Sequence, residues 1–273
     1  MARPNLSYLK NLILFLYGLP LGMLTGLTAI AGSVFAVPAA RSLLGLRSAR
    51  AVGTGLAVTF FAAFASLLSY SQHHDVYFGL ALLMTVFQIV GAAWGERVAA
   101  RLPGLDRLGW LWGTLVAVGG VAMLAQGMGY WHAPVPRFGP GLGHVAFYAL
   151  AALLATLVGL GSRVMGIGGV LLVPAVVYGL GLAPHVAQGT ALVVLALAGL
   201  PGMLIHAQRG DVEPQGATWL SAGAVFGALS GALWAVSLPG RVLLVLFGLM
   251  AALLGVLRLW RGETPPTSQE LEV

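Results

Sequence analysis

The sequence predicts an all-α protein that crosses a membrane many times and consists of two inverted-topology repeats. Three observations support this: the composition, an internal repeat, and the placement of the cationic residues. Hydrophobic residues make up 59% of the 273-residue chain and charged residues 8%, and the mean hydropathy is +0.92. A soluble domain carries about 25% charged residues. This chain therefore has too few to cover a surface that faces water.

The chain repeats itself with a constant offset of 136 residues. Gly32-Ser-Val-Phe-Ala-Val-Pro-Ala39 returns as Gly168-Gly-Val-Leu-Leu-Val-Pro-Ala175, and Thr54 returns as Thr190 (190 − 54 = 136). Each copy interrupts an apolar run with Gly and Pro at the same place. Paired interruptions of this kind are typical of secondary transporters, whose binding sites lie at broken helices.

The apolar runs follow one another along both halves, and a helix needs about 20 such residues to cross a bilayer. The first half offers the segments 12–30, 34–46, 51–70, 77–94 and 108–128. The second half offers 144–160, 170–182, 187–206, 216–236 and 242–259. We therefore expect about 8–10 transmembrane segments, in which the short runs 34–46 and 170–182 complete two broken or re-entrant helix pairs.

The domain organisation follows from these segments. Residues 11–128 form the first transmembrane repeat and residues 143–260 the second. Between them, residues 129–142 are rich in Pro and Gly and are expected to be a periplasmic connector. The polar tail at 261–273 is expected to be disordered and cytoplasmic.

The cationic residues orient the chain. If the first two segments of each half enter and leave on the same side, one side receives Arg3, Lys10, Arg41, Arg47, Arg50, Arg97, Arg101, Arg107, Arg209, Arg258 and Arg261. The other side receives only Arg137 and Arg241, and Arg163 is unassigned. If instead the first segment crosses and the second dips from the far side, the split is 7 to 6. The first arrangement satisfies the positive-inside rule. It gives each half an odd number of crossings, so the repeats are inverted and both termini are cytoplasmic.

The helix breaks are the first candidate site. Helices should break at Ile30-Ala-Gly32-Ser33 and at Gly166-Ile-Gly168-Gly169, with Pro174 tolerated in the first turns of the helix that follows. Free backbone N–H groups and the positive end of the helix dipole at a helix start favour an anion. Alternatively, these glycines allow close helix packing. Because both breaks recur, we favour the anion site.

Four polar side chains accompany the breaks. The hydroxyls of Thr54 and Thr190 either donate to a bound oxyanion or bond back to the carbonyl four residues earlier. Gln188 is a further donor. Arg163 is the natural counter-charge for an anion, or it caps the broken helix or extends to the interface. Asp75 and its mate Asp211 are better explained as helix N-caps than as ion-coupling groups.

Several function classes lack support. The chain has no cysteine, and His185 and His206 have no second ligand at metal spacing. HExxH, GxSxG and phosphate-loop patterns are missing from the sequence. We expect no enzymatic activity, catalytic residue, metal or cofactor. Since the basic residues are scattered among loops, no nucleic-acid partner is expected. The expected partners are a small anionic substrate and the lipid bilayer, and a homo-oligomer is left open.

The run 166–174, followed by Gly181-Leu-Ala-Pro-His-Val-Ala-Gln-Gly-Thr190, resembles the TauE/SafE family of sulfite and organosulfonate exporters. The first half carries a diverged version at 31–38 and 50–54, so the resemblance spans about residues 12–259. It implies a multi-pass transporter of the bacterial inner membrane for small sulfur-containing anions. From the two inverted repeats, we expect export of such an anion by alternating access. The alternatives are an anion channel of the same fold and, with less support, a membrane-embedded enzyme.

Overall fold

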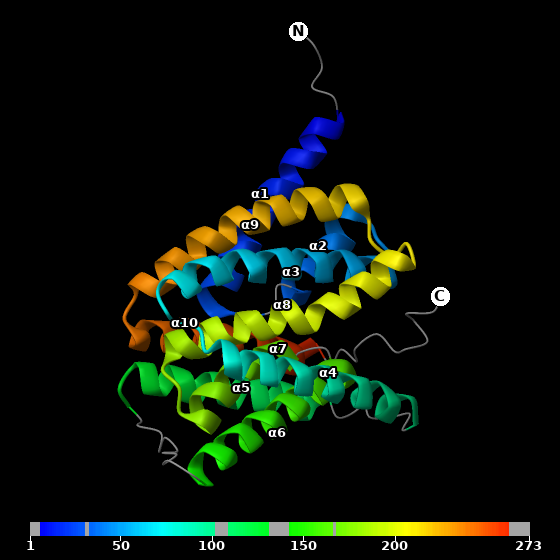
Figure 1. The fold of residues 1–273 in the computed structure, drawn as a ribbon. Helices are drawn as coiled ribbons and strands as arrows, with labels where there is room; N and C mark the ends of the chain where they lie inside the picture. The colour runs from blue at the N-terminus through cyan, green and yellow to red at the C-terminus, as the bar shows by residue number, and fades with distance from the viewer. Residues whose placement is uncertain (1–5, 31–32, 102–108, 131–141, 166–167, 262–273) are drawn as a thin grey trace.

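The computed structural model describes residues 6–30, 33–101, 109–130, 142–165 and 168–261. Every regular element in these ranges is a helix, which confirms the all-α fold (Figure 1). The first half contains α1 (Leu6–Thr28), α2 (Ser33–Leu44), α3 (Ser48–Gln72), α4 (Phe78–Arg101) and α5 (Gly109–Gly127). The second half contains α6 (Leu142–Met165), α7 (Gly168–Pro174), the π-helical turn η2 (Ala175–Gly179), α8 (Pro184–Gln208), α9 (Pro214–Ser237) and α10 (Gly240–Arg261).

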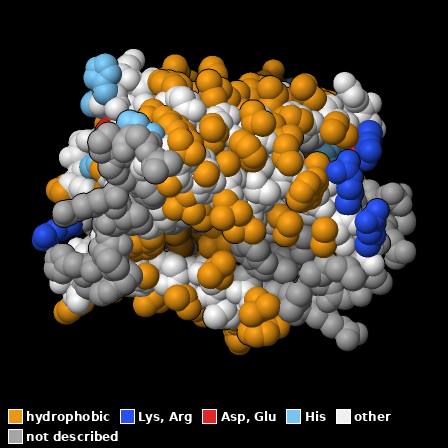
Figure 2. Space-filling model, turned by 60° about the horizontal axis from the view of Figure 1, so that its bottom comes forward, with side chains coloured by type: hydrophobic (Ala, Val, Ile, Leu, Met, Phe, Trp, Pro, Cys, Tyr) orange, Lys and Arg blue, Asp and Glu red, His pale blue; other side chains and the backbone are white. Residues whose placement is uncertain are grey.

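The long helices suit a bilayer. Seven helices of the described chain are long and apolar enough to cross a membrane. Figure 2 shows hydrophobic side chains over the middle of one face, with Lys and Arg side chains toward its two ends. An apolar band between charged ends is what a bilayer requires, so the multi-pass membrane architecture predicted from composition is confirmed.

The short helices α2 and α7 follow long helices, as the repeat predicts. In the first half, α1 and α2 form a helical hairpin. At the start of this hairpin, Asn11 of α1 accepts a hydrogen bond from Gln215 of α9 over 2.7 Å. At its end, Leu44 of α2 lies against Gly216. The α1–α2 hairpin therefore begins and ends beside the same end of α9.

Pro174 behaves differently from the expectation that it lies in the first turns of its helix. It is the last residue of α7, and the π-helical turn η2 follows it directly. Proline has no N–H and its ring clashes with the carbonyl four residues earlier. A π-helical turn accommodates such a local interruption. Pro38 occupies the matching place but lies inside the regular helix α2.

The helices of the two halves are exchanged. First-half α1 packs along second-half α9, and second-half α6 packs along first-half α4. Glycines make the first contact very close: a Cβ built at Gly18, Gly22 or Gly26 would overlap the backbone carbonyls of Leu220, Ala224 or Ala228. Successive glycines along α1 meet successive residues along α9, so the two helices run parallel.

The two remaining pairs join repeat mates and run antiparallel. Gly53 lies near the start of α3 and His206 near the end of α8. A Cβ built on Gly53 would lie 3.0 Å from the Cβ of His206. At the other end Tyr70 of α3 contacts Gln188 of α8. The same reversal relates α5 and α10, where Gly113 lies beside Leu259 and Gly127 beside Arg241. In Figure 1, α3 and α8 lie side by side between α9 and α4.

Candidate functional site

The helix before the first predicted break ends inside the protein. α1 ends at Thr28, and Ala29 and Ile30 after it are fully buried. Ala29 adopts a left-handed conformation with φ 52°, which favours the end of a helix and costs a residue with a side chain about 1–2 kcal/mol. The Thr28 hydroxyl donates to the carbonyl of Leu24 over 2.6 Å and accepts from the N–H of Ile30 over 3.3 Å. Local hydrogen bonds therefore hold the buried end.

The predicted break residues are only partly described. Gly32 lies outside the described residues, and Ser33 begins α2, although its side chain is not among those described. Gly168 and Gly169 are the first two residues of α7. Arg163 belongs to the last turn of α6, and its side chain is likewise outside the described part. Gly166 and Ile167, on which the predicted second break falls, lie outside the described residues.

Thr54 and Thr190 have a role that neither sequence-based alternative anticipated. The hydroxyl oxygen of Thr54 accepts a hydrogen bond from the backbone N–H of Glu213 over 3.1 Å. The hydroxyl oxygen of Thr190 accepts one from the backbone N–H of Tyr77, also over 3.1 Å. The two donors are repeat mates (213 − 77 = 136). Both threonines are fully buried, and each keeps a hydroxyl proton with which it can donate to another acceptor.

The glycine before each threonine packs against the same turn that the threonine binds. A Cβ at Gly53 would overlap the carbonyl of Asp211, and a Cβ at Gly189 would overlap that of Asp75. Each Gly-Thr pair therefore holds the turn that connects two helices of the other half. The motif that the sequence marks as a ligand site is also a contact between the two halves.

Removing these hydroxyls is expected to destabilise the protein. Thr54→Val or Thr190→Val leaves a partly buried N–H without its acceptor, at a cost of about 1–3 kcal/mol. We expect both variants to unfold at a lower temperature than the parent in detergent. The matched control is Thr156→Val, because the Thr156 hydroxyl only bonds back to Ala152 of its own helix over 2.8 Å. Unchanged melting in both variants would contradict the proposed contact.

Gln188 is held by a residue that sequence reasoning missed. The hydroxyl of Tyr70 lies 2.8 Å from Oε1 of Gln188 and 3.2 Å from the carbonyl of Gly26. One phenolic proton serves one of these acceptors at a time. The three residues join the end of α1 to α3 and α8. Repeat symmetry gave no signal for Tyr70, because its mate is His206, and Gln188 has Val52 as its mate.

The acidic residues of the α8–α9 turn differ from the N-capping expectation. The residue that caps α9 is Glu213, whose carboxylate accepts from the N–H of Gly216. Asp211 instead lies with its Oδ2 3.6 Å from Nδ1 of His206. Asp211 is therefore not the cap, because α9 begins three residues after it, at Pro214, and the cap position falls on Glu213.

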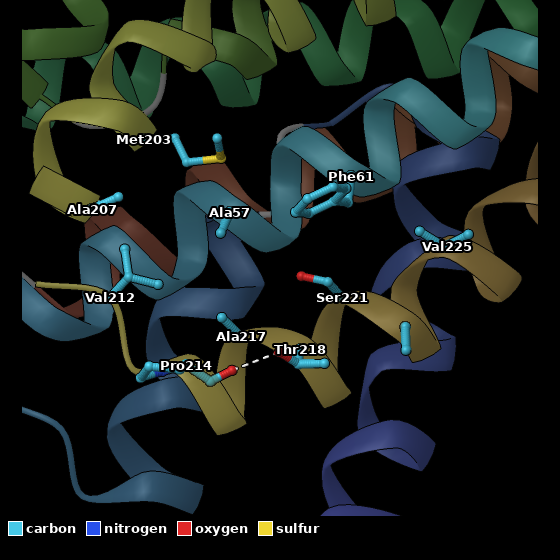
Figure 3. Close-up of a pocket in the computed structure, with 11 residues that line it drawn as sticks. Ala57, Phe61, Met203, Ala207, Val212, Pro214, Ala217, Thr218, Ser221 and Val225 are labelled. Atoms are coloured by element: carbon cyan, nitrogen blue, oxygen red, sulfur yellow. Dashed lines mark hydrogen bonds between the residues drawn. The ribbon is translucent and has the colours of Figure 1, made fainter. Parts of the chain in front are cut away.

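A cavity of about 520 Å³ lies elsewhere, between α3, α8 and α9 (Figure 3). It is lined by Ala57, Phe61, Met203, Ala207, Val212, Pro214, Ala217, Thr218, Ser221, Ala222 and Val225. The lining contains two hydroxyl side chains and carries no charged side chain. An anion would lose its hydration there without a counter-charge. This cavity therefore does not fit a small anion.

Together, the fold and these contacts define a polytopic membrane protein whose two halves exchange helices and whose first helix ends in the protein interior. The sequence model of the family Sulfite exporter TauE/SafE matches residues 2–123 and 139–272. The chain belongs to this family of membrane transporters, as the resemblance predicted.

Individual relatives match a shorter stretch. A "Probable membrane transporter protein" of Xylella fastidiosa (strain Temecula1 / ATCC 700964) is 32% identical over 115 residues, which is 41% of this chain. A protein of the same description from strain 9a5c is 32% identical over 116 residues, or 42% of this chain. The chain covers 44% of the length of each of these relatives. No solved structure matches it.

Proposed function

We propose that this protein is a secondary transporter that exports a small sulfur-containing anion, of the sulfite or organosulfonate class, by alternating access. The observation that carries the proposal is the antiparallel packing of the repeat mates α3 and α8 and of α5 and α10. Mates that run in opposite directions imply halves of opposite orientation. Inverted repeats provide two equivalent arrangements around one central site, which is the basis of alternating access.

The helix directions also support the proposed orientation. Arg47 at the start of α3 and Arg209 after α8 lie at the same end of the protein, since Gly53 and His206 are in contact there. Asn11 joins α1 to the start of α9 at that end too. The positive-inside rule assigns this end to the cytoplasm. We infer cytoplasmic termini and a location in the bacterial inner membrane.

The substrate class rests on the chemistry of the breaks. The starts of α2 and α7 carry backbone N–H groups that no preceding helical turn uses. Arg163 lies one turn before the second break and supplies the positive charge. Thr190 and Gln188 offer neutral donors near the start of α8, whereas Thr54 lies at the opposite end of the antiparallel α3–α8 pair. Oxyanions of sulfur accept several hydrogen bonds at once, so they match this donor set.

Proteoliposomes test the activity. We expect saturable uptake of radiolabelled sulfite or taurine, and accelerated exchange when unlabelled substrate is present on the other side. Linear flux without such counter-flow would identify an anion channel instead. The substrate is chosen first by thermal stabilisation of the purified protein with sulfite, sulfate, thiosulfate, sulfoacetate and taurine. If none of these anions stabilises or crosses, the proposed substrate class is wrong.

The inverted topology has its own test. His74 and Gly210 are repeat mates (210 − 74 = 136), and each lies in an exposed turn. The chain has no native cysteine, so single cysteines at these two positions report cleanly. We expect a membrane-impermeant maleimide to label the cysteine at 74 from the periplasm and the cysteine at 210 only after the cytoplasmic side is opened. Labelling of both from one side would mean parallel repeats.

A further inference from the structure

The cavity between α3, α8 and α9 opens on the outer wall of the helix bundle. Among its lining residues, Phe61, Ala207 and Thr218 are exposed. Phe64 and Phe226, which lie next along α3 and α9, are exposed as well. A wall of exposed apolar side chains on membrane-spanning helices faces acyl chains. The mouth of the cavity therefore opens toward lipid.

One polar group inside the cavity has no partner. Ser221 is only 7% exposed, and its hydroxyl has no hydrogen-bond partner among the described residues. The other hydroxyl of the lining, that of Thr218, already donates to the carbonyl of Pro214 over 2.7 Å. Figure 3 shows the Ser221 side chain directed from α9 toward α3. An apolar cavity with one free donor selects an apolar molecule that carries one acceptor.

The length of the cavity matches one leaflet. Its lining on α9 runs from Pro214, the first residue of that helix, to Val225. Eleven residues of helix rise about 16 Å, and half of the hydrocarbon core of a bilayer is about 15 Å thick. The cavity therefore reaches from the membrane edge to the midplane, which is the depth of one acyl chain.

Charges at the outer end suit a phospholipid headgroup. Arg209 is exposed and lies two residues after Ala207, which lines the cavity. Lys10 precedes Asn11, which is hydrogen-bonded to Gln215 at the start of α9. The acidic neighbours are already used, because Glu213 caps α9 and Asp211 lies beside His206. Two cations at this end can pair with a phosphate.

We propose that this cavity is a binding site for one membrane phospholipid. One acyl chain occupies the apolar cavity, and the Ser221 hydroxyl donates a hydrogen bond to the ester carbonyl of that chain. Arg209 and Lys10 pair with the headgroup phosphate. The site belongs to one leaflet only: Thr85, the mate of Ser221, donates its proton to Ala81 of its own helix over 2.8 Å.

Native mass spectrometry of the full chain tests the site, with palmitoyl-oleoyl phosphatidylethanolamine and its diether analogue as probes. The parent should retain one ester lipid and bind the diether, which lacks the carbonyl, about 2- to 10-fold more weakly, as expected for one hydrogen bond. Ser221→Ala should bind both probes equally weakly. Ala222→Phe should lose both because the ring fills the cavity. Its control is Val86→Phe. Val86 is the repeat mate of Ala222 and is exposed on α4, so this variant should bind the lipid like the parent.

Three outcomes would overturn the proposal. One is equal retention by Ala222→Phe and the parent, because the lipid would then bind elsewhere. Another is that Ser221→Ala still binds the ester lipid more tightly than its diether analogue. The third is displacement of the lipid by oleate or by taurine at similar concentrations, which would assign the cavity to a free fatty acid or to the transported substrate. Size-exclusion profiles identify any variant that fails to fold. If Ala222→Phe does not fold, the comparison of the two lipids in Ser221→Ala tests the proposal.

Discussion

Replacing Gly22 with valine is expected to prevent stable folding of the protein. The new Cβ would overlap the backbone of Ala224 in α9, and a backbone cannot move aside as a side chain can. Overpacking of ordinary side chains already costs about 1–3 kcal/mol, so we expect a loss of at least about 3 kcal/mol here. Helix association in a bilayer depends on such close van der Waals contact, since lipid chains are as apolar as the helices.

The measurement is the yield and melting temperature of the folded protein in mild detergent. Gly199→Val is the matched control, because Gly199 also lies within a membrane-spanning helix, α8, and a Cβ there meets no atom within 4 Å. We expect the control to melt close to the parent. Similar melting of both variants would show that the α1–α9 contact is looser than the structure indicates.

Replacing Arg163 with glutamine is expected to weaken binding of the best anion more than tenfold. A charge-assisted hydrogen bond in a buried site contributes about 1.5–3 kcal/mol. Arg163→Lys should recover part of the affinity, because an ammonium keeps the charge but lacks the planar fork that matches an oxyanion. The apparent affinity is measured at fixed salt for the anion selected by thermal stabilisation.

Thr190→Val provides the contrast. Its hydroxyl binds the N–H of Tyr77, so its loss should lower the melting temperature more than the affinity. If Arg163→Gln bound the anion as well as the parent while Thr190→Val did not bind it, Arg163 would not be the counter-charge. The site would then rest on helix ends and hydroxyl groups.

The sequence predicted those features of the fold that depend on local composition. Apolar runs separated by Gly, Pro and charged residues define the helices, and α2 and α7 begin where the repeated Gly-Pro pattern predicts a break. The 136-residue offset also identified Thr54 and Thr190 as equivalent. The structure gives them equivalent partners, Glu213 and Tyr77, in the opposite halves.

Other contacts were beyond sequence reasoning for a physical reason. A repeat shows which residues are equivalent but not which surfaces meet, and here each half packs against the other. Tyr70 binds Gln188 across that interface, and neither residue has a similar mate. The π-helical turn after Pro174 was missed as well, because Pro38 at the equivalent position is accommodated in a regular helix.

The exchange of helices has a consequence for how the chain matures during synthesis. Pro214, which begins α9, is made 186 residues after Thr28, which ends α1 (214 − 28 = 186). At about 5–20 residues per second, the ribosome needs about 10–40 s to cover that distance. For this time the glycine face of α1 is in the membrane without its partner. The helix α6 emerges after α4 and can dock at once. The segment that is made first is therefore among the last to reach its final place.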